Sequence, residues 1–260
     1  MGRFELAWDV VMSAGTALRQ CHLNKDEVHR KTGHQDLVTY WDQETERLLR
    51  REILSAFPQD SIVGEEYPAA EIRTTSITWY LDPIDGTTNF INQHQNYAIS
   101  VGCWDGETPL FGLVLDVERQ HLYWAQKGSG AWRNKEPIHI SSRNRISELL
   151  LTTPGIQHTF LEEHPHRDGL IRLAQDVRGV RSLGSVALEL CEVATGEADL
   201  FVTMRSSPWD HNAARIILQE AGGVIYSLDG LPLPLNSKST VLALNSESLK
   251  DQIQRKYYEK

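Results

Sequence analysis

Residues 97–141 alternate short apolar runs with turn-forming residues, and this alternation limits the folds open to the chain. The turn positions are Asp105-Gly106, Gly128-Ser129-Gly130 and Asn134-Lys135. Such residues supply the backbone conformations that connect neighbouring strands. Short apolar runs between them are typical of consecutive strands. The stretch therefore predicts an antiparallel meander.

Helix-like and strand-like segments lie in separate blocks around this meander. Apolar spacing predicts a helix over residues 5–23 and a second one from Asp42 to just before Pro58. "SIVGEE" and "ITWYLD" are expected to be short buried strands with acidic ends, and residues 142–175 a polar junction with helices. Separate blocks of this kind favour an α+β fold of packed layers. The break near residue 141 predicts two halves, 1–141 and 142–260.

The C-terminal half carries one helix with clear start and stop signals. Pro208 stands at the start of "PWDHNAARIILQEAGG" and two glycines end it. Before it, residues 177–203 predict a strand, a loop, a helix and a strand. After it, "STVLALN" predicts a last strand, which a helix follows.

Composition argues against several kinds of partner. The 260 residues carry a formal net charge of -9, which disfavours nucleic acid and anionic membranes because both attract basic surfaces. No segment approaches the roughly 20 apolar residues of a membrane helix, and the N-terminus lacks the pattern of a signal peptide. Three scattered cysteines match neither a disulfide framework nor a zinc site. A cytoplasmic location is expected.

Two carboxylates end the apolar stretch "WYLDPIDGTTNF", at Asp82 and Asp85. Asp, Pro and Gly are turn residues, so the motif on its own is equally consistent with a hairpin turn. Glu65 and Glu66 end another apolar strand, where they could be solvated charges. Asp210 stands at the start of a helix, where it could be an N-cap. Together these acids gather at strand ends and helix starts, where functional sites are usually built.

Carboxylates at such positions have the chemistry of a magnesium site. Mg²⁺ prefers hard oxygen ligands, and two ions about 3.5–4 Å apart form the usual clamp for displacement at phosphorus. The ions would also let an acidic protein accept an anionic phosphate. In "DGTT", Gly86 allows a tight turn, and the N–H groups of Gly86 and Thr87 would seat a phosphate at a helix start.

Three motifs, "GEE", "WYLDPIDGTTNF" and "PWDHNAARIILQEAGG", resemble in order and spacing the inositol monophosphatase family of Mg²⁺-dependent, lithium-sensitive phosphatases. The similarity extends to "DLVTYWDQETERLLRREI" and "GSVALELCEVATGEADLF", so it covers nearly the whole chain. The resemblance implies a layered αβαβα sandwich of the inositol monophosphatase and fructose-1,6-bisphosphatase type. It also implies a homodimer and two or three Mg²⁺ ions per active site.

The resemblance also implies a role for each matched acid. Glu65, Asp82 and the carbonyl of Ile84 resemble ligands of a first Mg²⁺. Asp82, Asp85 and Asp210 resemble ligands of a second, so that Asp82 bridges the two ions. Glu65 is also expected to hold a weaker third ion and counts among the catalytic residues.

Other matched residues resemble those that handle water and substrate. Thr87 and Asp42 resemble the pair that orients the attacking water, with the Thr87 hydroxyl donating to Asp42. Lys31 matches a lysine on a mobile loop beside the metals. The residues Gly184, Ser185 and Val186 match the loop that touches the alcohol part of the substrate.

The chain departs from the family pattern at Thr203. Many inositol-specific members have a glutamate seven residues before the Asp of "WD", and here that position is Thr203, followed two residues later by Arg205. Inositol monophosphate is therefore one candidate substrate. Fructose-1,6-bisphosphate, a nucleotide or NADP 2′-phosphate, and broad specificity are alternatives. A third hypothesis is a catalytically weak regulator that binds metal and phosphate. It is disfavoured because the sequence has a suitable residue at every position that the family resemblance assigns to a metal ligand.

Overall fold

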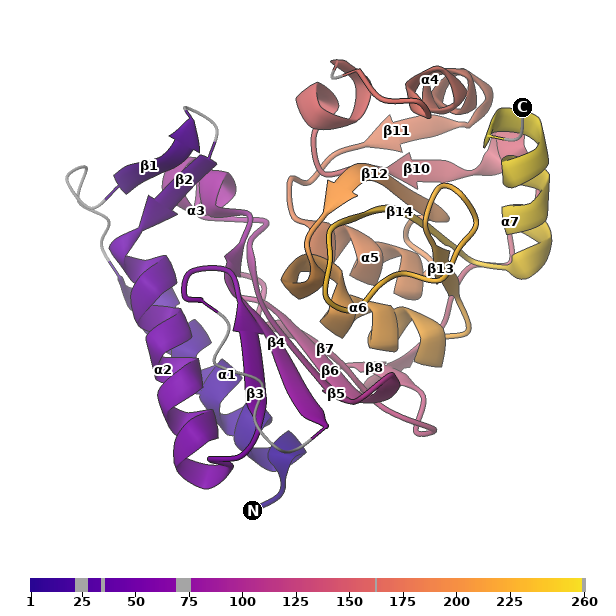
Figure 1. The fold of residues 1–260 in the computed structure, drawn as a ribbon. Helices are drawn as coiled ribbons and strands as arrows, with labels where there is room; N and C mark the ends of the chain where they lie inside the picture. The colour runs from indigo at the N-terminus through magenta and orange to yellow at the C-terminus, as the bar shows by residue number, and fades with distance from the viewer. Residues whose placement is uncertain (22–27, 34–35, 69–75, 162, 259–260) are drawn as a thin grey trace.

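The computed structural model describes residues 1–21, 28–33, 36–68, 76–161 and 163–258. Its elements stack in five layers, in the order helix, sheet, helix, sheet, helix (Figure 1). The three helical layers contain α1 (Arg3–Gln20) with α2 (Tyr40–Ala56), then α5 (Val186–Ala194) with α6 (Pro208–Glu220), then α4 (Arg167–Asp176) with α7 (Glu247–Ile253). The layers confirm the predicted α+β class and αβαβα sandwich.

The first sheet has seven strands in the order β3-β4-β5-β6-β7-β8-β9. Its strands are β3 (Ser61–Gly64), β4 (Ile77–Asp85), β5 (Ala98–Asp105), β6 (Thr108–Asp116), β7 (His121–Gln126), β8 (Ala131–Arg133) and β9 (Glu136–Ile138). Only the β3–β4 pair is parallel, and every later pair is antiparallel. The meander predicted for residues 97–141 is confirmed.

Both faces of this sheet are covered, so its strands are apolar almost throughout. Trp79 and Leu81 of β4 pack with α1 and α2, whereas Tyr80 between them belongs to the core around α5 and α6. Strand side chains alternate between the two faces of a sheet, which is why a continuous apolar run can serve both layers.

The second sheet mixes parallel and antiparallel pairs, in the order β11-β10-β12-β14-β13. Its strands are β10 (Leu150–Thr152), β11 (Gly179–Arg181), β12 (Leu200–Ser206), β13 (Val224–Tyr226) and β14 (Ser239–Leu244). Strand β10 lies inside the stretch predicted to be only a helical junction, so that prediction is wrong at this point. Its three residues are too few for a strand pattern to be recognised.

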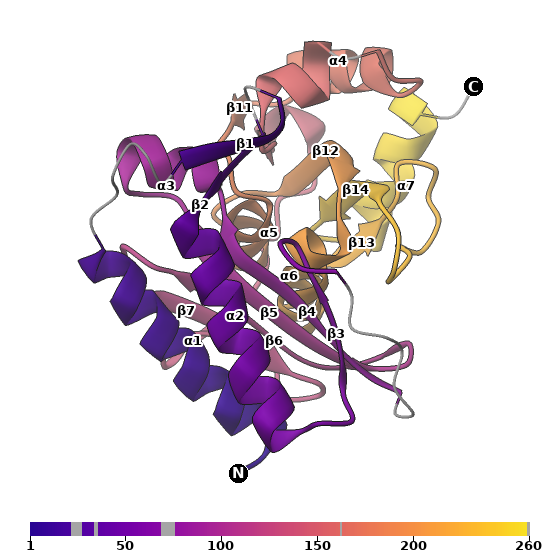
Figure 2. The same cartoon turned by 60° about the vertical axis from the view of Figure 1, so that its left-hand side comes forward.

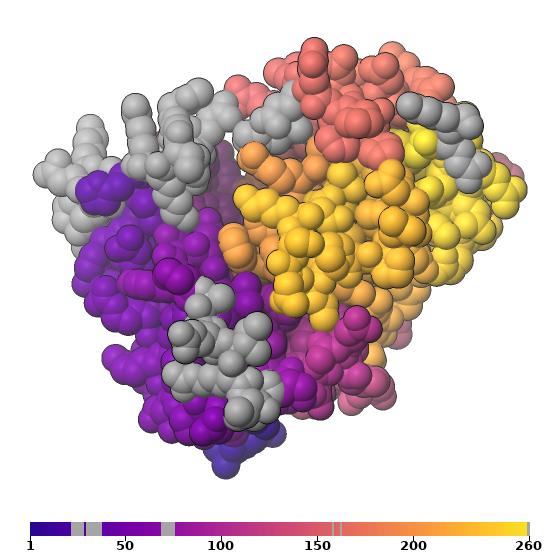
Figure 3. All heavy atoms as spheres, viewed as in Figure 1, coloured from indigo at the N-terminus to yellow at the C-terminus, as the bar shows by residue number. Residues whose placement is uncertain are grey.

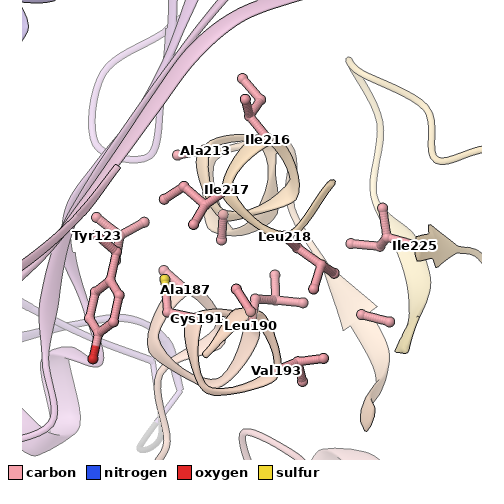
Figure 4. Packing of buried hydrophobic residues seen from close by; sticks show 14 of the residues in the cluster. Tyr123, Ala187, Leu190, Cys191, Val193, Ala213, Ile216, Ile217, Leu218 and Ile225 are labelled. Carbon is pink, nitrogen blue, oxygen red and sulfur yellow. The ribbon is translucent and has the colours of Figure 1, made fainter. Parts of the chain in front are cut away.

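Helices α5 and α6 fill the space between the sheets. Their apolar side chains, among them Ala187, Leu190 and Ile217, turn toward one another in Figure 4. The helix backbone lies close to the sheet, since a Cβ atom at Gly112 would stand 2.2 Å from the carbonyl oxygen of Ala213. Glycine at this position therefore lets α6 settle on strand β6.

A short hairpin and helix lie at one end of the first sheet. Figure 2 shows β1 (Val28–Gly33) and β2 (Asp36–Thr39) beside α3 (Thr87–Gln93), above the start of α2. Figure 3 shows the purple and magenta surface of the N-terminal half directly against the orange and yellow surface of the C-terminal half. The two sheets separate between residues 138 and 150, but division into two domains at residue 141 stays a prediction.

Candidate active site

Strands β3 and β4 bring Glu65 and Asp82 to the same end of the first sheet. Gly64 pairs with Leu81 in this parallel ladder, so the next residue of each strand emerges at the same level. Asp82 is buried, and its Oδ1 accepts a hydrogen bond from the backbone N–H of Ile84 at 3.1 Å. The β4–β5 register shifts between Asp82 and Asp85, where Pro83 has no N–H group to donate to the ladder.

Asp85 joins the two halves of the protein. Its carboxylate accepts hydrogen bonds from the Ser185 hydroxyl at 2.7 Å and from the backbone N–H groups of Val186 at 3.2 Å and Ala187 at 2.6 Å. These donors begin helix α5, whose N-cap is Ser185. The chain continues from Asp85 into helix α3 and only then into β5, so "DPIDG" is not a hairpin turn between these strands, and the role of Asp85 as a metal ligand stays a prediction.

Gly86 follows in a conformation that only glycine adopts readily. Its φ is +97°, and a Cβ atom would stand 3.0 Å from the carbonyl oxygen of Asn96 and 3.3 Å from that of Gly184. The "DGTT" turn and the loop before α5 therefore meet backbone to backbone. Thr87 and Thr88 open helix α3, where the first N–H groups have no acceptor within the helix.

Asp42 and Thr87 form the pair that the sequence predicts. The Thr87 hydroxyl lies 3.1 Å from Asp42 Oδ1 and 3.1 Å from the carbonyl oxygen of Ile84, and its single proton can serve one of them. Asp42 Oδ2 accepts the N–H of Thr39 at 2.8 Å and its hydroxyl at 2.6 Å. This capping box at the start of α2 fixes the carboxylate and leaves Oδ1 for Thr87.

Asp210 has the same position on α6 as Asp42 has on α2. It is the third residue of the helix rather than its N-cap, which is Ser207, so the N-cap interpretation was wrong by three residues. Its Oδ2 accepts the backbone N–H of Ser207 at 2.7 Å. In the described part of the chain, no residue donates a hydrogen bond to its Oδ1. Asp42 and Asp210 thus each use Oδ2 to accept hydrogen bonds from the N-cap residue of their helix, and Oδ1 takes no part in that cap.

The acids raise one another's pKa. Burial, and then the charges of Glu65, Asp85, Asp210 and Asp42, raise the pKa of Asp82 well above its usual range. Burial and the charge of Asp85 raise the pKa of Asp210 to about 8. Burial raises the pKa of Asp85 to about 6, although its three hydrogen bonds oppose the shift. Without a cation these carboxylates are held together against their mutual repulsion.

The donor chemistry fits Mg²⁺. All side chains of the cluster offer carboxylate oxygens, the hard ligands this ion prefers. Within the described residues, none of the ion pairs of arginine, lysine or histidine involves Asp42, Asp82, Asp85 or Asp210. Among the residues that the structure describes, no three of these acids are placed so that their oxygens already meet at one point.

The remaining predicted residues lie on β12, on the loop before α5 and on β1. Thr203 is buried in β12, where its hydroxyl donates to the carbonyl oxygen of Arg205 at 3.0 Å and accepts that residue's N–H at 3.3 Å. The predicted substrate loop, Gly184 to Val186, touches Gly86 and Asp85. The backbone of Lys31 belongs to β1, and its predicted place on a mobile loop stays a prediction.

Sequence reasoning missed three polar residues that hold these segments. Glu46 of α2 accepts the N–H of Glu66 at 2.7 Å and so fixes the turn that carries Glu65. Asn89 of α3 donates to the carbonyl oxygen of Leu183 at 2.6 Å. Glu189 of α5 holds the same loop from the other side. All three lie within stretches that carry the family similarity, but nothing in the sequence shows which backbone groups their side chains hold.

Comparison with known proteins decides the family. The model of the inositol monophosphatase family matches residues 4–259. The chain belongs to the inositol monophosphatase family. It is 36% identical over 244 residues to inositol-1-monophosphatase of Bacillus subtilis (strain 168), covering 93% of this chain and 91% of the relative. It is 35% identical over 254 residues to human inositol monophosphatase 1, covering 96% and 91%.

Solved structures of the family have the same fold. Inositol monophosphatase-II from Staphylococcus aureus MSSA476 superimposes with a TM-score of 0.87 at 31% identity, over 98% of this chain and 95% of that one. SaIMPase-II with inositol monophosphate bound gives 0.86 at 30% identity, covering 99% and 93%. SaIMPase-II with 2′AMP bound gives 0.85 at 31% identity, covering 99% and 94%. Membership of this family makes the chain a phosphatase.

Proposed function

We propose that this protein is a Mg²⁺-dependent phosphomonoesterase, which hydrolyses inositol monophosphate or a similar small phosphate ester with an activated water molecule. The observation that carries the proposal is the gathering of Asp82, Asp85 and Asp210, with raised pKa values, beside the Thr87–Asp42 hydrogen bond. A phosphatase of this kind mainly positions its reactants and neutralises charge, and no nucleophilic side chain is required.

Five residues would hold the metal ions. Glu65, Asp82 and the carbonyl oxygen of Ile84 would hold the first ion, and Asp82, Asp85 and Asp210 the second. Glu65 would also hold a weaker third ion. When bound, Mg²⁺ lowers the pKa of coordinated water and neutralises charge on the phosphoryl oxygens and the leaving alkoxide. The acids themselves supply the negative charge that retains the ions.

Thr87 and Asp42 would orient the attacking water. Asp42 is fixed by its capping box, so its Oδ1 accepts the Thr87 proton without moving. With its proton directed to Asp42, the Thr87 oxygen keeps its lone pairs for a proton of the water. The Thr87 hydroxyl has two acceptors at 3.1 Å, Asp42 Oδ1 and the carbonyl oxygen of Ile84. If an ion binds the Ile84 oxygen, the hydroxyl proton would go to Asp42.

The substrate would lie across the junction of the two halves. The N–H groups of Gly86 and Thr87 would face the phosphoryl oxygens, since helix α3 has no acceptor for its first amides. The alcohol part would face Thr203, Asp210 and the loop of Gly184, Ser185 and Val186. Lys31 would approach from the β1–β2 side. We further propose a lithium-sensitive homodimer, as the family resemblance implies, and a cytoplasmic location, as the scattered cysteines indicate.

A second substrate class deserves the same test. Thr203 offers one hydroxyl where inositol-specific relatives offer a carboxylate, and that hydroxyl is already bonded to Arg205. SaIMPase-II has been solved with 2′AMP as well as with inositol monophosphate. A nucleotide or NADP 2′-phosphate, or fructose-1,6-bisphosphate, is therefore the alternative substrate. A weak metal- and phosphate-binding regulator remains the third, less favoured hypothesis.

Phosphate release from a panel of esters separates these functions. The panel contains inositol 1-phosphate, 2′AMP, NADP, fructose-1,6-bisphosphate and glycerol 2-phosphate, each with Mg²⁺ and with excess chelator. We expect Mg²⁺-dependent release from at least one ester. The ranking of kcat/KM identifies the substrate class. Release from none of them, with metal binding retained, would favour the regulator.

A further inference from the structure

Four backbone N–H groups before and within the start of α5 are held by the carboxyl groups of two acids, Asp85 and Glu189. Asp85 accepts those of Val186 and Ala187. Glu189 Oε1 accepts those of Leu183 at 2.5 Å and Gly184 at 3.2 Å. The segment 183–187 is therefore fixed at one end by an acid of the proposed metal site and at the other by an acid outside that proposed ligand set.

Glu189 is costly to bury, which suggests that its position serves a purpose. Its side chain is fully buried, and among the described residues its Oε2 has no hydrogen-bond partner. An unpaired buried oxygen of this kind is destabilising. On the other face of the loop, Asn89 donates to the carbonyl oxygen of Leu183 at 2.6 Å and to that of Asn96 at 2.9 Å. The loop is thus held from helix α5 and from helix α3.

We propose that Glu189 is a positioning residue of the metal centre, which fixes the 183–187 segment so that its Ser185 hydroxyl and two amides orient the carboxylate of Asp85. This inference rests on the proposed function, because it takes Asp85 as a metal ligand. A carboxylate has about four lone-pair positions. Asp85 uses three of them on this segment, so the direction of the remaining one follows the loop.

Direct metal binding tests this role apart from catalysis. Glu189→Met keeps the length of the side chain but removes both acceptors, whereas Glu189→Gln keeps an acceptor oxygen at the same place. Mn²⁺ would serve as the probe, with its affinity measured by calorimetry on the full chain. Residues behind a metal ligand typically change metal affinity 10–100-fold, so we expect a loss of about that size for Glu189→Met. The Mn²⁺ affinity of Glu189→Gln should stay close to that of the unaltered protein.

A matched control lies one turn along the same helix. Glu192 is a half-buried carboxylate that makes no side-chain hydrogen bond to the loop in the described structure, so Glu192→Met should leave Mn²⁺ affinity unchanged. If Glu189→Met does not fold, Asn89→Ala, which removes the anchor on the other face, decides the question in the same assay. It should weaken Mn²⁺ binding as well.

The outcomes separate this inference from the proposed function. A variant with unchanged Mn²⁺ affinity and unchanged kcat, but a lower Tm, would show that Glu189 only stabilises the fold and would overturn the inference. An unaltered protein that binds Mn²⁺ yet releases phosphate from no ester contradicts the proposed function alone. An unaltered protein that binds no Mn²⁺ contradicts both. Weaker binding in Glu189→Met with recovery in Glu189→Gln supports the positioning role.

Discussion

The parallel strand pair β3–β4 has buried acids at both ends, and the two ends treat them differently. Asp60, just before β3, accepts two hydrogen bonds from the Arg3 guanidinium at 2.7 and 2.8 Å and one from Trp79 Nε1 at 2.9 Å. At the other end, Asp82 accepts the Ile84 N–H at 3.1 Å and lies among further carboxylates. Asp60 is neutralised by Arg3, whereas among the described residues no ion pair of Asp82 is found.

Buried aspartates elsewhere follow the first pattern. Asp199 is paired with Arg143 at 2.8 Å and Asp116 with Arg119 at 2.8 Å. A buried carboxylate is normally paired in this way because an isolated charge is expensive to desolvate. The acids of the proposed metal site therefore differ from these aspartates in their partners, not in their burial. Under the proposed function, an external cation would be the partner that they lack among the described residues.

Removal of divalent metal should have the largest effect. We expect no turnover in excess chelator and full recovery with Mg²⁺, while Ca²⁺, which is larger and looser in geometry, should not restore it. Mg²⁺ should also raise the Tm, since a ligand that binds only the folded state stabilises it. Phosphate release and a thermal melt, each with and without Mg²⁺, measure the two effects. Undiminished turnover in chelator would end the two-metal proposal.

Replacing one acid at each end of the β3–β4 strand pair, Asp85 at one end and Asp60 at the other, should separate the effect on catalysis from the effect on stability. Asp85→Asn keeps the shape and removes the charge, so turnover should be abolished while the protein stays folded. Asp60→Asn breaks a charged hydrogen-bond set worth about 1.5–3 kcal/mol, which should lower the Tm by roughly 3–12 °C. Its folded fraction should keep Mg²⁺-dependent turnover. Steady-state rates and melting curves of both variants make the comparison.

The opposite pattern would contradict this division. Near-normal turnover in Asp85→Asn would favour the turn-residue interpretation, because asparagine serves in turns about as well as aspartate. Loss of turnover in folded Asp60→Asn would show that the arginine-paired end also supports the site.

Removal of the Thr87 hydroxyl should have the next largest effect. Thr87→Ala leaves the metal ligands in place but takes away the group proposed to orient water, so kcat should fall by about 10²-fold or more with little change in KM. Thr88→Ala, at the exposed neighbouring position, is the matched control. A change in KM alone would assign Thr87 to substrate binding.

The structure brings together most of the acids that the sequence singles out, because they stand in short motifs at strand ends and helix starts, and their roles stay predictions. The sequence could not predict how Asp42 and Asp210 are fixed. Each is the third residue of its helix and accepts hydrogen bonds from the residue that caps that helix, and this depends on where the helix begins. Helix boundaries are uncertain from sequence by a few residues.

Contacts between distant segments were also beyond prediction. Glu189 lies only six residues from Leu183 in sequence. Its proposed positioning role, however, depends on how the loop between them folds against Asn89 and Asp85. The three-residue strand β10 was missed for a similar reason. It takes its place between β11 and β12 through partners from other parts of the chain, not through its own pattern.

The smallest effect, and the most specific one, concerns Thr203. If this residue faces the alcohol part of the substrate, Thr203→Glu should shift the kcat/KM ratio toward inositol 1-phosphate over glycerol 2-phosphate. A hydrogen bond to a charged group contributes about 1.5–3 kcal/mol, which corresponds to roughly a ten- to hundredfold shift. Thr203→Gln introduces a side chain as long as glutamate but without its charge, so it shows how much of the shift in the kcat/KM ratio comes from the charge.

The structure adds a cost that the sequence did not show. The Thr203 hydroxyl bonds both polar backbone groups of Arg205 where the β12–β14 register shifts, so a replacement without a hydroxyl loses these bonds and should lower the Tm. Thr203→Val isolates that cost, because it loses the hydroxyl without adding an acid. The exposed Arg205 could also pair with a new carboxylate, and the double change with Arg205→Ala would then restore the shift in specificity. If the ratio is the same in the single and double variants as in Thr203→Val, Thr203 does not face the leaving group, and specificity must be sought in the 184–186 loop.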